Sequence, residues 1–140
     1  MNLQFALDSY RSAGPASEVD SASRFRLIQI LMEHGLKSLS AAASADGDQQ
    51  QVARRAAIGK AIDAIETLRQ SLHEAPADAS LIEQLNALYG HMIEELLKAV
   101  AETGANRVRH VGKLLATLKS AWDELPKRAS TEPGLKGYFS

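Results

Sequence analysis

Four histidines are the residues best suited to chemistry in this sequence of 140 residues. Helical bundles that bind two iron or manganese ions carry a glutamate three residues before a histidine, both pointing into the core. No carboxylate occupies that position here, where the residues are Leu31, Gln70, Leu88 and Arg107. His91 and Glu95 share a helical face at i,i+4, but two ligands without others are more typical of a solvated face. We therefore predict no metal ion and no other cofactor.

An exposed histidine on a helical bundle can instead accept a phosphoryl group, with a nearby lysine to stabilise it. Two pairs have the i,i+3 spacing that places both side chains on one face: His34 with Lys37, and His110 with Lys113. The residue after each lysine is larger than the glycine that would leave room for a phosphate. A histidine phosphotransfer domain thus stays open as an alternative function.

Other catalytic chemistry finds no support in the sequence. The chain has no cysteine, which excludes a disulfide, a thiolate nucleophile and an iron–sulfur cluster. The run Gly134-Leu135-Lys136-Gly137 lacks the spacing of a phosphate-binding loop. The 16 Lys and Arg against 17 Asp and Glu lack the basic excess of a nucleic-acid-binding face. We predict a protein that is not an enzyme and does not bind nucleic acid.

The first 20 residues bear on the location of the protein. They contain no long apolar run, and they carry the charged residues Asp8, Arg11, Glu18 and Asp20. This composition differs from that of a secretory signal or a membrane span. We expect a cytoplasmic protein without membrane insertion.

The elements that must position any site are helices. Apolar residues are 45% of the chain and aromatic residues only 5%, and many of the apolar residues are Ala and Leu, which favour helices over strands. Apolar residues recur every three or four positions, the spacing of one helical face, in four segments: about 23–44, 49–74, 81–100 and 108–125.

Local signals set the expected ends of these helices. Ser23 is a plausible N-cap of the first helix and Ser80 of the third. We expect the first helix to end near Ala45, before Asp46-Gly47-Asp48, and the last to stop at Pro126.

Helices of about 20 residues reach roughly 30 Å, and short connectors force successive helices to run antiparallel. The prediction is an all-α fold, an up-down-up-down four-helix bundle over residues 23–125. An irregular N-terminal arm, residues 1–22, precedes it and a C-terminal tail, residues 126–140, follows. The expected buried core includes Ile28, Leu31, Ile65, Leu68, Leu85, Leu118 and Trp122.

Four stretches, in this order and at these separations, resemble the flagellar secretion chaperone family FliS: residues 21–31 (SASRFRLIQIL), 60–65 (KAIDAI), 85–92 (LNALYGHM) and 115–122. Two positions depart from the family pattern. Arg24 stands where the family typically has proline after the serine, and Gly90-His91 stands where an aromatic residue is common after Leu-Tyr.

The resemblance implies an antiparallel bundle in the cytoplasm that binds the disordered C-terminal segment of flagellin. Binding would prevent premature polymerisation, and the chaperone would deliver flagellin to the flagellar export gate. The second and third helices carry more apolar positions than one narrow core stripe needs, which leaves room for a groove. The residues expected to bind the partner are Tyr10, Ile28, Ile58, Ile62, Asn86, Tyr89, Met92 and Leu96.

Tyr10 falls where the family carries a tyrosine before its first helix, and Leu3, Phe5 and Leu7 precede it. We therefore expect the N-terminal arm to compete with the guest for the groove. Besides the phosphotransfer domain, a helical adaptor with another partner is the remaining alternative.

Overall fold

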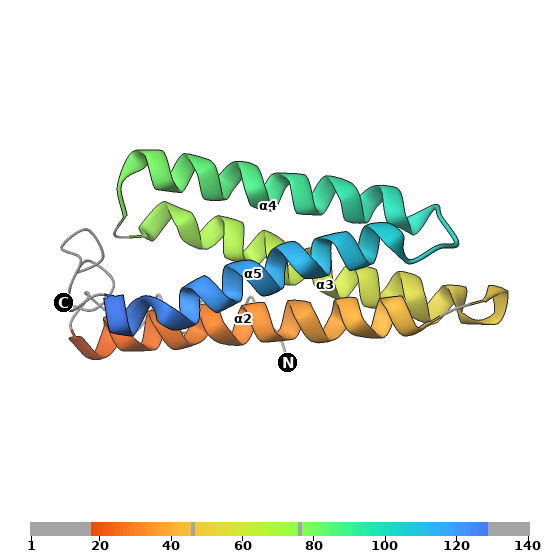
Figure 1. Cartoon of the computed structure of the whole chain (residues 1–140), viewed down its shortest axis with the longest axis horizontal. Coiled ribbons are helices and arrows are strands. Elements are labelled where there is room, and N and C mark those ends of the chain that lie inside the picture. Colours follow the sequence, from red (N-terminus) through yellow and green to blue (C-terminus); the bar gives the residue numbers. More distant parts are fainter. Residues whose placement is uncertain (1–17, 46, 76, 129–140) are drawn as a thin grey trace.

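The computed structural model describes residues 18–45, 47–75 and 77–128. Within these residues there are no strands, and four α-helices make up most of the structure: α2 (Glu18–Ser44), α3 (Gln51–Ser71), α4 (Ala79–Val100) and α5 (Asn106–Arg128). Short 3₁₀ helices, η1 (Asp48–Gln50) and η2 (Leu72–Glu74), flank α3. Successive helices run antiparallel (Figure 1). The prediction of an all-α, antiparallel four-helix bundle is confirmed.

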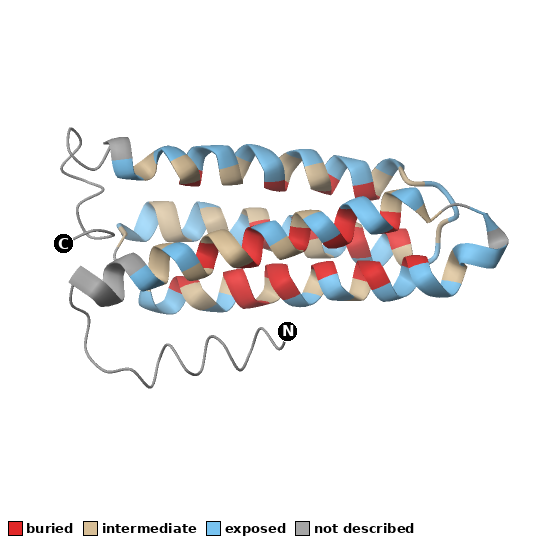
Figure 2. Cartoon of the chain, turned by 90° about the horizontal axis from the view of Figure 1, so that it is seen from below, coloured by how far each residue is buried: buried red, intermediate tan, exposed pale blue. Residues whose placement is uncertain are grey.

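Each helix packs mainly against two others, so the four form a closed ring in cross-section. The contacts run from α2 to α3, from α3 to α4, from α4 to α5 and from α5 back to α2. The α2–α3 interface is the most extensive and the α4–α5 interface the least. Buried residues lie on the sides of the helices that face one another (Figure 2).

The α2–α3–α5 side is closely packed because α2 carries a glycine at its centre. A Cβ added at Gly35 would lie 2.9 Å from Leu115 Cδ2 and 3.7 Å from Ala64 Cβ. Both neighbours are fully buried. The missing side chain therefore lets α3 and α5 approach the backbone of α2 together.

The expected core is largely confirmed. Five of the predicted residues are buried: Ile28, Leu31, Ile65, Leu68 and Trp122. Leu85 and Leu118, in contrast, are only partly buried and pack against the edge of the core. The prediction was wrong for these two, and both lie on the α4–α5 side of the bundle.

Three helices begin earlier than predicted: α2, α4 and α5. α2 begins at Glu18, so Ser23 lies inside the helix and does not cap it. Asp78, and not Ser80, caps α4: its backbone is extended, and its carboxylate accepts a hydrogen bond of 2.8 Å from the Leu81 backbone N–H.

Pro126 does not stop the last helix, which continues to Arg128. A proline costs most in a helix interior, where its missing N–H breaks the hydrogen-bond ladder. Here it lies in the last turn, so it removes one hydrogen bond of that turn, and the helix ends two residues later.

Candidate functional site

The core-facing stripe of α4 changes in burial along its length. Its six residues follow one another at steps of three and four, which places them on one face. The first two are only partly buried and the last four are buried; in order they are Ile82, Leu85, Tyr89, Met92, Leu96 and Ala99. The same face of one helix is thus covered at its C-terminal end and only partly covered at its N-terminal end.

The path of α5 explains this change. α5 crosses the bundle from the end of α4 to the start of α2 (Figure 1). Near its beginning, His110 lies beside His91 of α4, with 3.4 Å between the two Nε2 atoms. Near its end, Asp123 accepts a hydrogen bond of 2.8 Å from Gln29 Nε2 of α2. The second half of α5 therefore packs on α2 and leaves the first half of α4 without a close neighbour on that side.

The antiparallel register identifies which residues of α4 and α5 lie level with one another in this region. The contact between His91 and His110 places Leu88 level with Leu114, and one turn further it places Leu85 level with Leu118. All of these leucines are partly buried and pack against the core. We call this surface the open seam, formed by Leu81, Leu85 and Leu88 of α4 and Leu114, Leu118 and Leu125 of α5.

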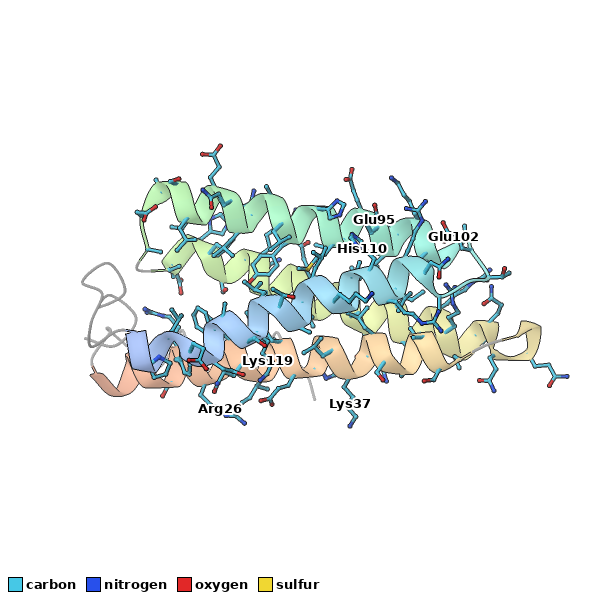
Figure 3. The ribbon with its side chains drawn as sticks, in the orientation of Figure 1. Arg26, Lys37, Glu95, Glu102, His110 and Lys119 are labelled. Carbon is cyan, nitrogen blue, oxygen red and sulfur yellow. The ribbon has the colours of Figure 1, made fainter. Side chains whose placement is uncertain are left out.

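Charged side chains close the other end of the α4–α5 interface. Arg107 of α5 donates hydrogen bonds to Glu95 of α4 and to Glu102 of the connecting turn. Figure 3 labels the two carboxylates, near the end of α4 that leads into α5. The hydrogen bond from Arg107 lowers the pKa of the Glu95 carboxyl, and the two carboxylates raise the pKa of the Arg107 guanidinium. This cluster joins the start of α5 to the C-terminal half of α4, outside the open seam.

Sequence reasoning missed Arg54, which holds the turn between α4 and α5. Its guanidinium is almost completely buried and donates to the backbone carbonyls of Ala99, Glu102 and Gly104 at 2.9, 2.8 and 2.6 Å. Ala99 lies in the last turn of α4, where unpaired acceptors gather at the negative end of the helix dipole, and Glu102 and Gly104 lie in the turn that follows. The signal was present, because Arg54 precedes Ile58 and Ala61 at apolar spacing on α3.

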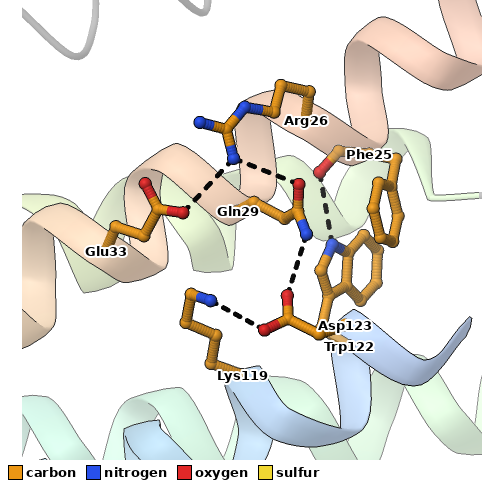
Figure 4. A network of polar contacts seen from close by, with 7 residues as sticks. All are labelled: Phe25, Arg26, Gln29, Glu33, Lys119, Trp122 and Asp123. Atoms are coloured by element: carbon orange, nitrogen blue, oxygen red, sulfur yellow. Dashed lines mark hydrogen bonds and ion pairs between the residues drawn. The ribbon is translucent and has the colours of Figure 1, made fainter.

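A second polar cluster joins the start of α2 to the end of α5 (Figure 4). Trp122 stacks on Phe25, with 5.1 Å between ring centroids, and donates from Nε1 to the Phe25 carbonyl at 3.2 Å. Asp123 accepts from Lys119 Nζ at 2.7 Å as well as from Gln29. Hydrogen bonds from Lys119 and Gln29 lower the pKa of the Asp123 carboxyl. This cluster fixes the end of α5 on α2, away from α4.

The residues predicted to bind the partner fall into three groups. Ile28, Ile58, Tyr89, Met92 and Leu96 are buried in the core. Ile62 is partly buried on α3 and Asn86 is exposed on α4. Tyr10 lies outside the described residues. The leucines of the open seam were not predicted as partner contacts, although Leu81, Leu85 and Leu88 continue the stripe of Met92 and Leu96 toward the surface.

The two histidine–lysine pairs proposed for phosphotransfer do not share one environment. His34 is partly buried on α2 beside the exposed Lys37. His110 is exposed, but its Nε2 faces the Nε2 of His91. No observation in the described part of the chain favours phosphoryl transfer over histidines without a chemical role.

The described residues, 18–45, 47–75 and 77–128, bear on metal binding and on membrane insertion. Among them, no three or more His, Asp or Glu side chains are grouped so that they could hold a metal ion. Nor does any helix among them have the length and apolar character needed to cross a membrane.

Comparison with known proteins decides the family. Residues 6–129 match the family model described as flagellar protein FliS. The chain belongs to the FliS family. A flagellar secretion chaperone FliSB of Pseudomonas aeruginosa is 34% identical over 118 residues, which are 84% of this chain and 93% of that relative. The flagellar secretion chaperone FliS of Escherichia coli is 34% identical over 117 residues, 83% of this chain and 85% of the relative.

A more distant relative, the flagellar secretion chaperone FliS of Vibrio cholerae, is 25% identical over 124 residues, 89% of this chain and 90% of the relative. No solved structure gives a significant match. Membership of the FliS family supports a chaperone role in flagellar export. The resemblance seen in the sequence is thus confirmed at the level of the family.

Proposed function

We propose that this FliS-family chain binds the disordered C-terminal segment of flagellin in the cytoplasm, keeps it from polymerising, and delivers it to the export gate of the flagellar secretion apparatus. It does so as a binding protein, without catalysis or a cofactor. The observation that carries the proposal is the open seam, a row of partly buried leucines on two helices that diverge from each other.

The open seam suits a guest that is unfolded on its own. Two rows of leucine side chains facing one opening can accept the apolar face of a helix laid along them, in the way that amphipathic helices dock in apolar grooves. Ordering a disordered guest offsets part of the interaction energy, so a large contact stays reversible. Reversibility is what an export chaperone needs, because the guest must leave.

Residues predicted earlier as contacts take different places in this proposal. Asn86 is exposed one position after Leu85 and is free of the core, so its amide can bond a guest backbone at the rim. Ile62 lies partly exposed on α3. Met92 and Leu96 hold the closed end of the same stripe, and they reach a guest only if α4 moves away from α5. The arm around Tyr10 remains a proposed competitor for the guest.

The test is calorimetric titration of the chain with a peptide of the flagellin C-terminal segment. We expect Leu85→Ser and Leu118→Ser each to weaken binding at least about tenfold, equivalent to about 1.4 kcal/mol. Leu97→Ser is the matched control: Leu97 lies on α4, is 58% exposed and lies off the seam-facing stripe, so this variant should bind like the parent protein.

Circular dichroism establishes first that each variant is folded. Folded seam variants that bind the peptide with unchanged affinity would place the site elsewhere. The helical adaptor would be favoured by a different result: the parent protein does not bind the peptide, and Leu85→Ser and Leu118→Ser weaken its binding to another protein partner.

A further inference from the structure

The contact between His91 and His110 is unusual among the polar contacts of the bundle. The two imidazoles come from different helices, both are exposed, and they meet edge to face at an interplanar angle of 85°. Their Nε2 atoms are 3.4 Å apart. Hydrogen bonds from N–H donors are typically about 2.9–3.0 Å long, so this pair is a poor hydrogen bond. It brings together two nitrogens that can each donate a lone pair.

Their separation matches that of two ligands on one metal ion. Zn–N bonds of about 2.0–2.1 Å at the tetrahedral angle place two ligand nitrogens about 3.3–3.4 Å apart. The side chains of His91 and His110 thus hold their two Nε2 atoms at the required distance. With 5.7 Å between ring centroids the two Nε2 atoms point at each other, so both exposed rings must turn to direct their lone pairs at one metal ion.

A carboxylate near this position favours a cation, whereas the cationic Lys113, one turn after His110 on α5, opposes it. Glu95 lies one turn from His91 on the same helix, and its carboxylate stays ionised because of the hydrogen bond from Arg107. Arg107 itself is neutralised by two carboxylates, Glu95 and Glu102. A metal ion between the imidazoles would thus lie near an anionic carboxylate and beside a cation that is already paired.

We propose that His91 and His110 together bind one divalent transition-metal ion, with Zn²⁺ as the ion that the geometry fits, on the surface where α4 meets α5. Water fills the remaining coordination positions, since the described residues offer no third ligand in place. A site with two protein ligands is reversible, unlike the closed four-ligand sites of structural zinc. A bound ion would link α4 to α5 directly beside the open seam, where the two helices otherwise have little contact.

The experiment is calorimetric titration of the untagged full chain with Zn²⁺ alone, in buffer free of chelators. We expect one Zn²⁺ per chain, and we expect His91→Ala and His110→Ala each to lower the affinity about tenfold or more. The matched control is His73→Ala, because His73 is exposed in η2 and lies outside the pair; it should bind Zn²⁺ as the parent protein does. If an alanine variant loses helicity, the glutamine variant at the same position takes its place.

Thermal unfolding is the second measurement. An ion that binds only the folded chain raises the midpoint, by about 5–10 °C at a free concentration one hundred times the Kd. The double variant His91→Ala/His110→Ala should lose this rise and His73→Ala should keep it. Equal Zn²⁺ affinity in the parent protein and in both single variants would overturn the proposal. So would a loss in His73→Ala as large as the loss in His91→Ala.

Discussion

The two sides of this bundle are built from similar residues and packed very differently. On the α2–α3–α5 side, Gly35 lets Leu115 and Ala64 close onto the α2 backbone, and the side chains there are fully buried. On the α4–α5 side, Leu85 and Leu118 occupy equivalent helical positions and are only partly buried. This difference shows that the apolar face of a helix becomes buried core only where a second helix lies alongside it. In this chain the direction of α5 decides where that is.

The largest expected effect is at the contact that fixes that direction. Truncating Trp122 to alanine removes its stack on Phe25 and its hydrogen bond to the Phe25 carbonyl. The loss in unfolding free energy should be about 3–5 kcal/mol, measured by urea denaturation. Trp122→Phe is the control, because it keeps an aromatic ring and loses the donor, and should cost about 1 kcal/mol. A midpoint that hardly changes for Trp122→Ala would show that this contact does not hold α5 on α2.

The next prediction compares the two sides with one substitution. Leu115→Ala removes a fully buried side chain from the closed side and should cost about 3 kcal/mol. Leu88→Ala removes a partly buried side chain from the open seam and should cost about 1 kcal/mol, because folding removes less apolar surface of this side chain from water. Chemical denaturation measures both, and equal losses would mean that the seam is packed as tightly as the closed side.

Glycine substitutions should change stability in opposite directions. Gly35→Ala places a Cβ 2.9 Å from Leu115 Cδ2 in the closed side, so overpacking should outweigh the gain in helix propensity and cost about 1 kcal/mol. A Cβ at Gly59 of α3 meets nothing within 4 Å, so Gly59→Ala should stabilise by about 0.5–1 kcal/mol. Thermal unfolding measures both variants. If both midpoints rise, or both fall, relative to the parent protein, the close approach at Gly35 is contradicted.

The smallest effect concerns pH. The pKa of Asp123 is lowered in the folded chain, mainly by the hydrogen bond from Lys119. Its contribution to stability is therefore present above the unfolded pKa of about 4 and is lost as the pH falls through the folded pKa. Since the side chain is 37% exposed, the contribution should stay below about 1 kcal/mol. Asp123→Asn should flatten the fall of the thermal midpoint between about pH 5 and pH 3, and an unchanged fall would show that Asp123 contributes nothing.

Helix number, helix length and most of the core could be predicted from the sequence, because they depend on spacing along one segment. Leu31, Ile65 and Leu68 lie in apolar repeats with helical spacing, and all three are buried as predicted. Leu85 and Leu118 repeat at the same steps but are only partly buried. No local pattern distinguishes the two groups, since burial depends on which helix lies opposite.

Helix ends were predicted less well, because several residues near each end can serve as caps. Asp78 and Ser80 are both good capping residues, and only the extended backbone at Asp78 decides between them. Pro126 was expected to end α5 and lies inside its last turn, two residues before the helix ends.

The sequence by itself determined that the chain is four antiparallel helices of the FliS family, since helical periodicity, short connectors and the matched motifs are all local properties. Only the tertiary structure decided what those helices enclose. His91 and His110 lie 19 residues apart and meet because α4 and α5 turn back on each other. Arg54 finds its three carbonyl acceptors 45–50 residues away. The open seam exists because α5 leaves α4 to pack on α2. Each of these features depends on the angle between helices, which is set by side-chain packing across the whole bundle and not by any single segment.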